Sequence, residues 1–325
     1  MNTRKALVVG IENYPGKPLK GCCNDTSSLE KLLAYHENGT PNFAVIKKDN
    51  VQSKIMLKTL IEQCFDGNAD IALFYYSGHG HIDSDDGYLV TPDYVEGDWG
   101  VKFQDVLSIV TASKCKERII ILDCCYSGFM GNVSALGQSI AVINEGVTIL
   151  AASRKDESAL LIGKNSLFTS FLLEALSGGA ADVLGNITVG SVYAFINKSL
   201  GSGGQIPVFK TNVTHFATLR EVNPRVDISI IKNLVNYFSN DNSQFRLDPS
   251  FEQTNTPEVK HEIIEPYAED KHVKIFKDLQ KLESIGLVVP VDERHMYFAA
   301  MNSKSCQLTA VGKYYWQLVK KGVIK

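Results

Sequence analysis

The sequence predicts an α/β fold, in which a mainly parallel sheet of six strands carries helices on both faces and a small α+β domain follows. Continuous apolar runs, typical of strands buried on both faces, occur at Asp70–Tyr76 and Ile119–Cys124. Strand-like runs alternate with helix-like segments from Lys5 to Phe209, which is typical of parallel sheets. A change of composition after Val213 predicts the second domain.

The elements of the large domain are expected in a regular order. Short apolar runs predict strands at Lys5–Ile11, Phe43–Lys47, Asp70–Tyr76, Ile119–Cys124, Val147–Ala152 and Ile206–Phe209. Apolar residues at helical spacing predict helices over residues 24–36, 51–65, 101–112, 167–176 and 189–200. Asn24 or Asp25 could cap the first helix, and Gly87–Pro92 is expected to form a short hairpin arm. In such a sheet the chemistry is expected at the carboxyl ends of the strands.

Two small-residue turns follow the third and fourth expected strands. Residues Tyr76–Gly80 read YSGHG, and Asp123–Gly128 read DCCYSG. Neighbouring strands lie about 5 Å apart, so His79 and a cysteine of the second motif can share one site. An imidazole there lowers the pKa of the thiol and later protonates the leaving amine. The alternatives are a structural histidine in a glycine turn and, at Cys124, an inert buried thiol.

These two motifs, in this order and spacing, resemble the paired signature of caspase-like cysteine peptidases, most of all metacaspases and their bacterial relatives. The resemblance covers roughly residues 4–212. It implies that Cys125 is the nucleophile, that His79 is the general acid and base, and that the backbone N–H groups of Gly80 and Cys125 form the oxyanion hole. It also implies that the first, third and fourth strands are neighbours. Many metacaspases carry histidine where this chain has Tyr126, a departure that leaves the Cys-His dyad intact.

Three more residues are expected beside the nucleophile once those strands are neighbours. Asp25 follows the first strand, Ser77 precedes the histidine turn, and Asp123 ends the nucleophile strand. Two carboxylates facing a substrate favour the side chain of Arg or Lys. Metacaspases are similar, because they carry acids at the matching positions and cut after Arg or Lys. The alternative interpretation makes Asp25 a helix cap and Asp123 a strand-end acid.

A specificity for Arg or Lys also determines where the enzyme could cut its own chain during maturation. No Lys or Arg occurs between Tyr126 and Gly146, and the first basic residue after the nucleophile is Arg154. An enzyme that cuts after basic residues could not cut itself in this connector. The sequence therefore predicts activity as a single uncut chain.

The overall composition is that of an ordinary globular protein. The 325 residues are 44% hydrophobic and 21% charged, with a net charge of −3 that gives no general attraction to nucleic acid or to a membrane. Seven cysteines without framework spacing favour reduced thiols and a cytoplasmic location. No signal peptide and no transmembrane segment are expected.

No cofactor and no metal are required by this chemistry. Asp83, Asp85 and Asp86 suggest a calcium loop, because some metacaspases are activated by calcium. The three acids lack the regular spacing of a dedicated calcium loop, so a solvated turn is the favoured interpretation and calcium the alternative. His81, close by, is expected to be a solvated loop residue.

The expected domains are a caspase-like peptidase domain over residues 1–220 and a smaller domain over residues 221–325. A helix over 227–238 and a long polar loop over 239–257 are expected to open the smaller one. An amphipathic helix over 271–284, two short strands around a charged turn in 285–301, and a final helix from Leu308 resemble a winged-helix domain.

The charge of the smaller domain bears on its partner. Residues 226–325 hold 13 Lys plus Arg and 13 Asp plus Glu, although residues 294–325 hold six basic residues and no acid. A neutral domain supplies little of the electrostatic term that drives nucleic-acid binding. We therefore expect a domain that binds an unidentified protein regulator or activator, with nucleic acid as the less favoured partner.

Two functions from different classes remain. The first is a cytoplasmic cysteine endopeptidase that cuts protein substrates after Arg or Lys and is controlled through its C-terminal domain. The second is a catalytically silent caspase-like binding protein, or a nucleic-acid-binding regulator that acts through the winged helix. The intact pair of His79 and Cys125 favours the first, because a relic is expected to have lost at least one of them. Fusion to a small C-terminal module resembles bacterial proteins of stress, cell-death or antiphage defence signalling.

Overall fold

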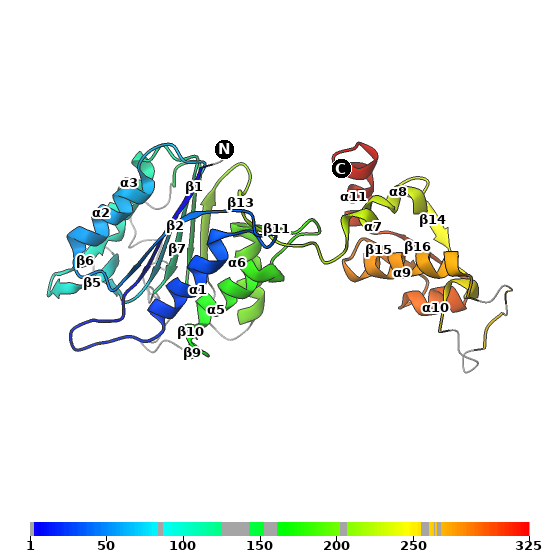
Figure 1. Cartoon of the computed structure of the whole chain (residues 1–325), viewed down its shortest axis with the longest axis horizontal. Helices are drawn as coiled ribbons and strands as arrows, with labels where there is room; N and C mark the ends of the chain where they lie inside the picture. Colours follow the sequence, from blue (N-terminus) through cyan, green and yellow to red (C-terminus); the bar gives the residue numbers. More distant parts are fainter. Residues whose placement is uncertain are drawn as a thin grey trace. The chain divides into compact units, whose positions relative to one another are not determined.

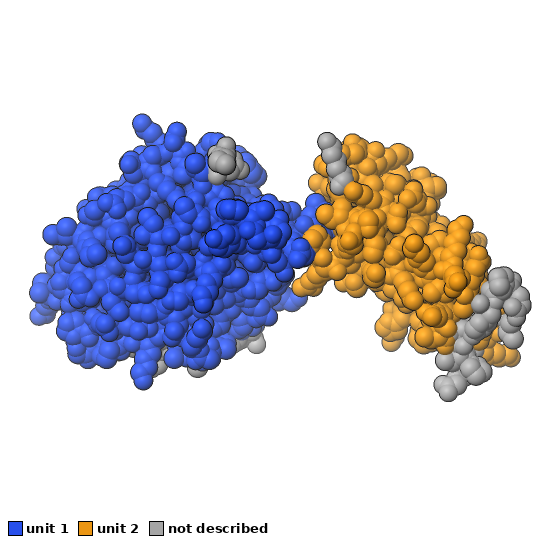
Figure 2. All heavy atoms as spheres, in the orientation of Figure 1, with its two compact units in different colours: residues 1–223 blue, residues 224–325 orange. Residues whose placement is uncertain are grey.

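The chain forms two compact units, residues 1–223 and residues 224–325 (Figure 2). The computed structural model describes residues 3–83, 87–124, 143–152, 161–201, 207–254, 260–262, 264 and 268–324. The division falls between Asn223 and Pro224, close to the expected boundary after residue 220.

The first unit is built around a central sheet (Figure 1). Its six strands follow the order β12–β8–β7–β3–β1–β2. Its strands are β1 (Arg4–Gly10), β2 (Ala44–Asp49), β3 (Ile71–Ser77), β7 (Glu117–Asp123), β8 (Val147–Ala151) and β12 (Val208–Asn212). All neighbours run parallel except β12, which is antiparallel to β8. The predicted α/β class and mainly parallel six-stranded sheet are confirmed.

The apolar side chains of the central strands contribute to two hydrophobic cores, one on each face of the sheet. All seven residues of β3 are buried. Phe74 and Tyr76 belong to one hydrophobic cluster, whereas Leu73 and Tyr75 belong to the other. Because successive side chains of a strand point to opposite faces, a strand between two helical layers has to be apolar throughout.

Helices cover both faces of this sheet, as predicted (Figure 1). The helices α2 (Lys54–Phe65) and α3 (Phe103–Ala112) lie on one face. The opposite face carries α1 (Cys22–Ala34), α5 (Leu167–Glu174), which continues into the π-helical turn η1 (Ala175–Gly179), and α6 (Val189–Leu200). The first unit is thus a three-layer structure whose strand ends emerge between the two helical layers.

The first helix begins earlier than the sequence pattern predicts. Its N-cap position is Gly21, with φ 99° and no side-chain cap bond. The prediction that Asn24 or Asp25 caps this helix is therefore wrong. Asp25 lies in the first turn, where its side chain points into the protein and is completely buried.

A three-stranded antiparallel sheet follows β3. It consists of β4 (Gly80–Ile82), β5 (Gly87–Val95) and β6 (Asp98–Lys102), and β5 is the expected hairpin arm. His81 lies in β4 and is half-buried, with its ring 3.9 Å from the ring of Trp99 between centroids. The expectation of a solvated loop residue at this position is therefore wrong. The described part of the unit also contains two strand pairs, β9 (Leu161–Ile162) with β10 (Asn165–Ser166) and β11 (Asn186–Thr188) with β13 (Thr218–Glu221).

The second unit packs helices around a small sheet in the order β14–β16–β15. Its strands are β14 (Gln244–Arg246), β15 (Val288–Val291) and β16 (Ser305–Leu308). Its helices are α7 (Ile228–Lys232), α8 (Leu234–Tyr237), the 3-10 turn η2 (Pro249–Phe251), α9 (Asp270–Ser284), α10 (Met296–Met301) and α11 (Ala310–Lys320). Phe276 of α9 and Trp316 of α11 are among its buried side chains, and the indole of Trp316 donates to the carbonyl of Phe238 at 2.9 Å.

Three sequence-based expectations for this unit are wrong. The expected second strand of a hairpin is the helix α10, in which Met296, Ala299 and Ala300 are buried at the i, i+3, i+4 spacing of a helix. The paired strands β15 and β16 lie on either side of that helix, so the helix–hairpin–helix order behind the winged-helix hypothesis is not present. The expected long loop over 239–257 contains β14 and η2. The expected helix over 227–238, by contrast, is present as α7 and α8, which are divided only at Asn233.

The described part of the chain contains no helix that is long and apolar enough to span a bilayer. Six of the seven cysteines lie in this part, and none of these six forms a disulfide. Cys23 is half-buried and the other five are buried.

Candidate active site

The carboxyl ends of β1, β3 and β7 lie level with one another. In the strand register Gly10 pairs with Ser77, and Ser77 pairs with Asp123. The N–H of Gly78 lies 3.4 Å from the carbonyl oxygen of Asp123, so the turn after β3 begins beside the end of β7. These are the first, third and fourth strands expected from the sequence. The expectation that they are neighbours is confirmed, with β3 between β1 and β7.

The backbone of His79 is fixed within the turn between β3 and β4. Its N–H donates to Tyr14 Oη at 3.1 Å, and its carbonyl accepts from the N–H of Val90 at 3.0 Å and from Tyr76 Oη at 2.9 Å. The preceding residue has to be glycine, because a Cβ at Gly78 would lie 2.5 Å from Tyr14 Oη. Sequence and packing thus hold the imidazole at one place on the sheet edge.

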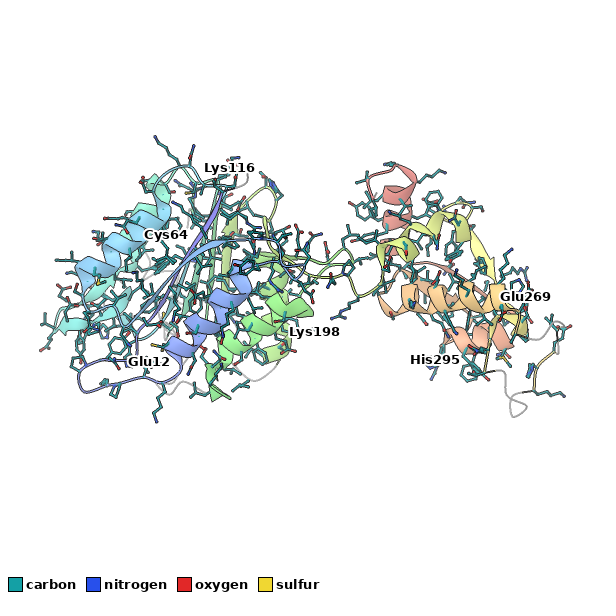
Figure 3. All side chains as sticks on the ribbon, viewed as in Figure 1. Glu12, Cys64, Lys116, Lys198, Glu269 and His295 are labelled. Carbon is teal, nitrogen blue, oxygen red and sulfur yellow. The ribbon has the colours of Figure 1, made fainter. Side chains whose placement is uncertain are left out.

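The orientation of the imidazole follows from one contact. His79 Nε2 lies 2.8 Å from the backbone carbonyl oxygen of Lys17, in the loop after β1. A carbonyl oxygen only accepts, so Nε2 carries the proton, and Nδ1 of the neutral ring keeps the lone pair that can take a proton from a nucleophile. Glu12, labelled in Figure 3 at the start of this loop, accepts from the N–H of Cys23 at 3.0 Å and ties the loop to α1.

The expected nucleophile, Cys125, lies outside the described residues, as does Tyr126. Cys124 precedes it at the end of β7 and is 1% exposed, within the core on the side of α2 and α3. Gly80 begins β4 directly after His79 and pairs with Leu89 of β5. The structure thus positions His79 and Gly80 at the strand ends, and the catalytic roles assigned to these residues and to Cys125 stay predictions.

The expected pocket residues Asp25, Ser77 and Asp123 lie together, and each is at most 3% exposed. Ser77 Oγ donates to Asp25 Oδ2 at 3.0 Å. Ser166 bridges the two acids, because its N–H donates to Asp25 Oδ1 at 3.0 Å and its Oγ donates to Asp123 Oδ2. Thr169 Oγ1 also donates to Asp123 Oδ2, at 2.7 Å. Their role in substrate binding stays a prediction.

The two carboxyl groups influence each other electrostatically. Burial, and after it the negative charge of Asp123, raise the pKa of Asp25 to about 6. Hydrogen bonds from Asn165, Ser166 and Ser77 oppose this shift. A guanidinium or ammonium group beside the pair would relieve the repulsion between the two carboxylates, which is the property that a pocket for a basic side chain needs.

Sequence reasoning missed several residues that complete this region. They are Tyr14 and Lys17, which hold His79, and Asn165, Ser166 and Thr169, which hold the acid pair. One local signal was available, since Ser166 caps α5 by accepting from the N–H of Thr169. Nothing local relates this cap to Asp25, which lies 141 positions earlier in the chain.

The described residues contain no group of three or more His, Cys, Asp or Glu side chains that could hold a metal ion. Of the acids that suggested calcium, Asp83 is described, whereas Asp85 and Asp86 lie outside the described residues. The calcium alternative therefore stays a prediction.

Comparison with known proteins identifies the family to which the first unit is related. Residues 3–217 match the caspase domain. The chain belongs to the caspase-domain family. It resembles the solved structure of protein GSU0716 from Geobacter sulfurreducens, with 17% sequence identity and a TM-score of 0.50 over 68% of this chain and 98% of that one. Caspase-1 from Spodoptera frugiperda is also similar, with 17% identity and a TM-score of 0.47 over 68% of this chain and 91% of the other.

No curated protein matches the chain. Membership of the caspase-domain family supports a caspase-like cysteine peptidase in general terms, and such a peptidase implies protein substrates. The mainly parallel six-stranded sheet and its helices agree with a caspase-like fold.

Proposed function

We propose that the chain is a cysteine endopeptidase that cuts protein substrates after Arg or Lys. The observation that carries this proposal is the buried pair of Asp25 and Asp123, joined through Ser166 at the same strand ends as the His79 turn. A pocket built on two carboxylates favours a basic side chain and repels an acidic one. Family membership supplies the reaction, and the acid pair supports the choice of substrate.

The proposed mechanism uses Cys125 as nucleophile and His79 as acid and base. Nδ1 of His79 takes the thiol proton, and the thiolate attacks the carbonyl carbon of the scissile bond. The N–H groups of Gly80 and Cys125 then stabilise the negatively charged oxygen. When the C–N bond breaks, the imidazolium protonates the leaving amine, and water later releases the acyl group. Throughout, the carbonyl of Lys17 holds the ring in one orientation through Nε2.

Three peptides that differ only in the residue before the scissile bond test the substrate class. With arginine we expect efficient cleavage, and with aspartate none that can be measured. Citrulline has nearly the shape of arginine without its charge, so it isolates the electrostatic term. Losing the partner of a buried charge costs about 3–5 kcal/mol, so cleavage after citrulline should be slower by at least about a hundredfold.

The measurement is kcat/KM for each peptide, with and without calcium. Preferred cleavage after aspartate would overturn the acid-pocket assignment and leave the dyad mechanism standing. Activity that appears only with calcium would favour the calcium alternative. Silence towards every peptide in every condition would favour a catalytically silent binding protein.

We also propose that the enzyme acts as a single uncut chain. Residues 127–145 contain no Lys or Arg, so the connector after the nucleophile offers no site for an enzyme of this specificity. A fully active preparation is therefore expected to run as one intact band on a denaturing gel. Activity that rises only in step with two smaller fragments, and that is lost when the cut is prevented, would contradict this proposal.

The second unit is proposed to bind a regulator that controls the peptidase. It has its own buried core and its own sheet, as expected of an independent module. Its equal numbers of basic and acidic residues from 226 to 325 favour a protein over nucleic acid as the partner. A place in bacterial stress, cell-death or defence signalling remains part of this proposal.

A further inference from the structure

A cavity of about 350 Å³ lies beside His79. Among the described residues, eight line it, and five of these carry aromatic or imidazole rings, namely Tyr14, His79, His81, Tyr94 and Trp99. Pockets that bind small ligands begin at about 300 Å³, so the cavity has room for one large side chain. The ring of Tyr14 meets that of His79 edge to face, at 4.6 Å between centroids.

The cavity and the acid pair lie on opposite faces of the central sheet. Tyr14 and Val90, which line the cavity, belong to the core on the side of α2 and α3. Asp25 comes from α1, and Thr169, which holds Asp123, comes from α5 on the other face (Figure 1). The His79 turn lies between them at the strand ends. A peptide whose basic side chain enters the acid pair therefore has to pass His79 before it reaches the cavity.

The aromatic wall of the cavity is supported from several directions. Tyr94 and Trp99 stack with their planes 19° apart and their centroids separated by 5.8 Å, and His81 packs on Trp99. Tyr94 Oη donates to the carbonyl of Pro15 at 3.2 Å, which joins this wall to the loop that holds His79. A wall supported in this way is formed before a ligand arrives and loses little entropy on binding.

The charges around the cavity limit what it can accept. Burial lowers the pKa of His81 below its ordinary value of 6.5, although the charge of Asp83 opposes the shift, so the neutral imidazole predominates at neutral pH. Lys17 is exposed at the cavity and carries a positive charge. The cavity therefore suits an uncharged aromatic or large apolar group, whereas Lys17 would repel a second cation.

We propose that this cavity binds a large apolar or aromatic side chain of the residue that follows the scissile bond. The inference rests on the proposed peptidase function. His79 has to lie within hydrogen-bond reach of the leaving nitrogen to protonate it, so the leaving segment runs along the imidazole that forms one wall of the cavity. The enzyme would thus recognise a pair of residues, a basic one before the bond and an apolar one after it.

The test uses internally quenched peptides that are identical except for phenylalanine, alanine or lysine directly after the arginine. Peptides with fluorescent aromatic leaving groups are avoided, because such a group could itself fill the cavity. Burial of a phenyl ring against aromatic partners should make kcat/KM for phenylalanine at least about tenfold higher than for alanine. For the peptide with lysine after the arginine, kcat/KM should be lower than for the alanine peptide.

Two variants of Trp99 test whether the cavity causes the preference for phenylalanine. Trp99→Ala should bring the ratio of kcat/KM for the phenylalanine peptide to kcat/KM for the alanine peptide close to one, and its circular dichroism spectrum should show a folded protein. Trp99→Phe should keep most of the preference. Equal rates for the three peptides with wild type, or a preference that survives Trp99→Ala, would overturn the proposal.

A binding measurement separates this inference from the proposed function. Phenylalaninamide resembles the released amine end of a product, and its binding requires no catalysis. It should bind wild type more tightly than alaninamide and should lose this advantage in Trp99→Ala, as measured by calorimetry. If peptides are not cut but this binding occurs, the peptidase assignment fails and the cavity assignment stands. If neither amide binds better than the other, the cavity assignment fails as well.

Discussion

Replacement of Cys125 by alanine is expected to reduce hydrolysis of arginine peptides by at least about a thousandfold. In the proposed mechanism the thiolate of Cys125 forms the covalent bond to the substrate, and a methyl group cannot form it. Binding should persist, because the acid pair is untouched. The measurement is kcat/KM for the arginine peptide, together with the affinity of the variant for the same peptide.

Cys124→Ala is the matched control, since the two cysteines are adjacent. Cys124 is buried in the core, and its thiol should contribute to packing rather than to catalysis. Its loss should lower the free energy of unfolding by about 1 kcal/mol and leave most of the activity. The opposite pattern, with Cys124→Ala inactive and Cys125→Ala active, would show that the nucleophile has been assigned to the wrong residue.

Replacement of Asp25 by asparagine is expected to have the second largest effect, and it should change activity and stability in opposite directions. Removing one negative charge from the acid pair should reduce cleavage after arginine by about a hundredfold to a thousandfold. Cleavage after citrulline should change little, because citrulline carries no charge. The asparagine fits the hydrogen-bond pattern, since its oxygen can accept from Asn165 and Ser166 while its amide donates to Ser77 Oγ.

The stability effect follows from the pKa of Asp25. Its value in the folded chain, about 6, is raised above the ordinary value of 3.8. The folded state therefore binds a proton there more tightly than the unfolded state, and the resulting stabilisation is complete below the ordinary pKa and is lost as the pH rises through the folded pKa. At neutral pH the buried charge costs about 1–3 kcal/mol, so asparagine should stabilise the protein there and have almost no such effect at about pH 3.

Thermal unfolding of wild type and variant at both pH values measures this effect. Asp105→Asn serves as the control, because Asp105 lies on α3 and forms a partly exposed pair with Lys58 at 3.1 Å. This control should change the free energy of unfolding by less than about 1 kcal/mol and leave activity intact. Full cleavage after arginine by Asp25→Asn would mean that Asp25 lies outside the substrate pocket.

Local pattern explains most of the fold that could be predicted. The continuous apolar run of β3 predicted a strand buried on both faces, and the structure shows its side chains in two separate cores. The hydrophobic pattern gave a wrong prediction where a segment could form either a helix or a strand. The segment Met296–Met301 is short and apolar, and a strand and a buried helix look alike at that length until the neighbouring elements select one of them.

The sequence by itself determined the class of fold, the succession of its main strands along the chain and the two motifs at their ends. Each of these depends on residues close together in the chain. Only the tertiary structure decided how the site is completed. The carbonyl of Lys17 orients the imidazole of His79, and Ser166 joins Asp25 to Asp123. These hydrogen bonds link residues 62, 141 and 43 positions apart, so their formation depends on strand register and helix packing that no local pattern encodes.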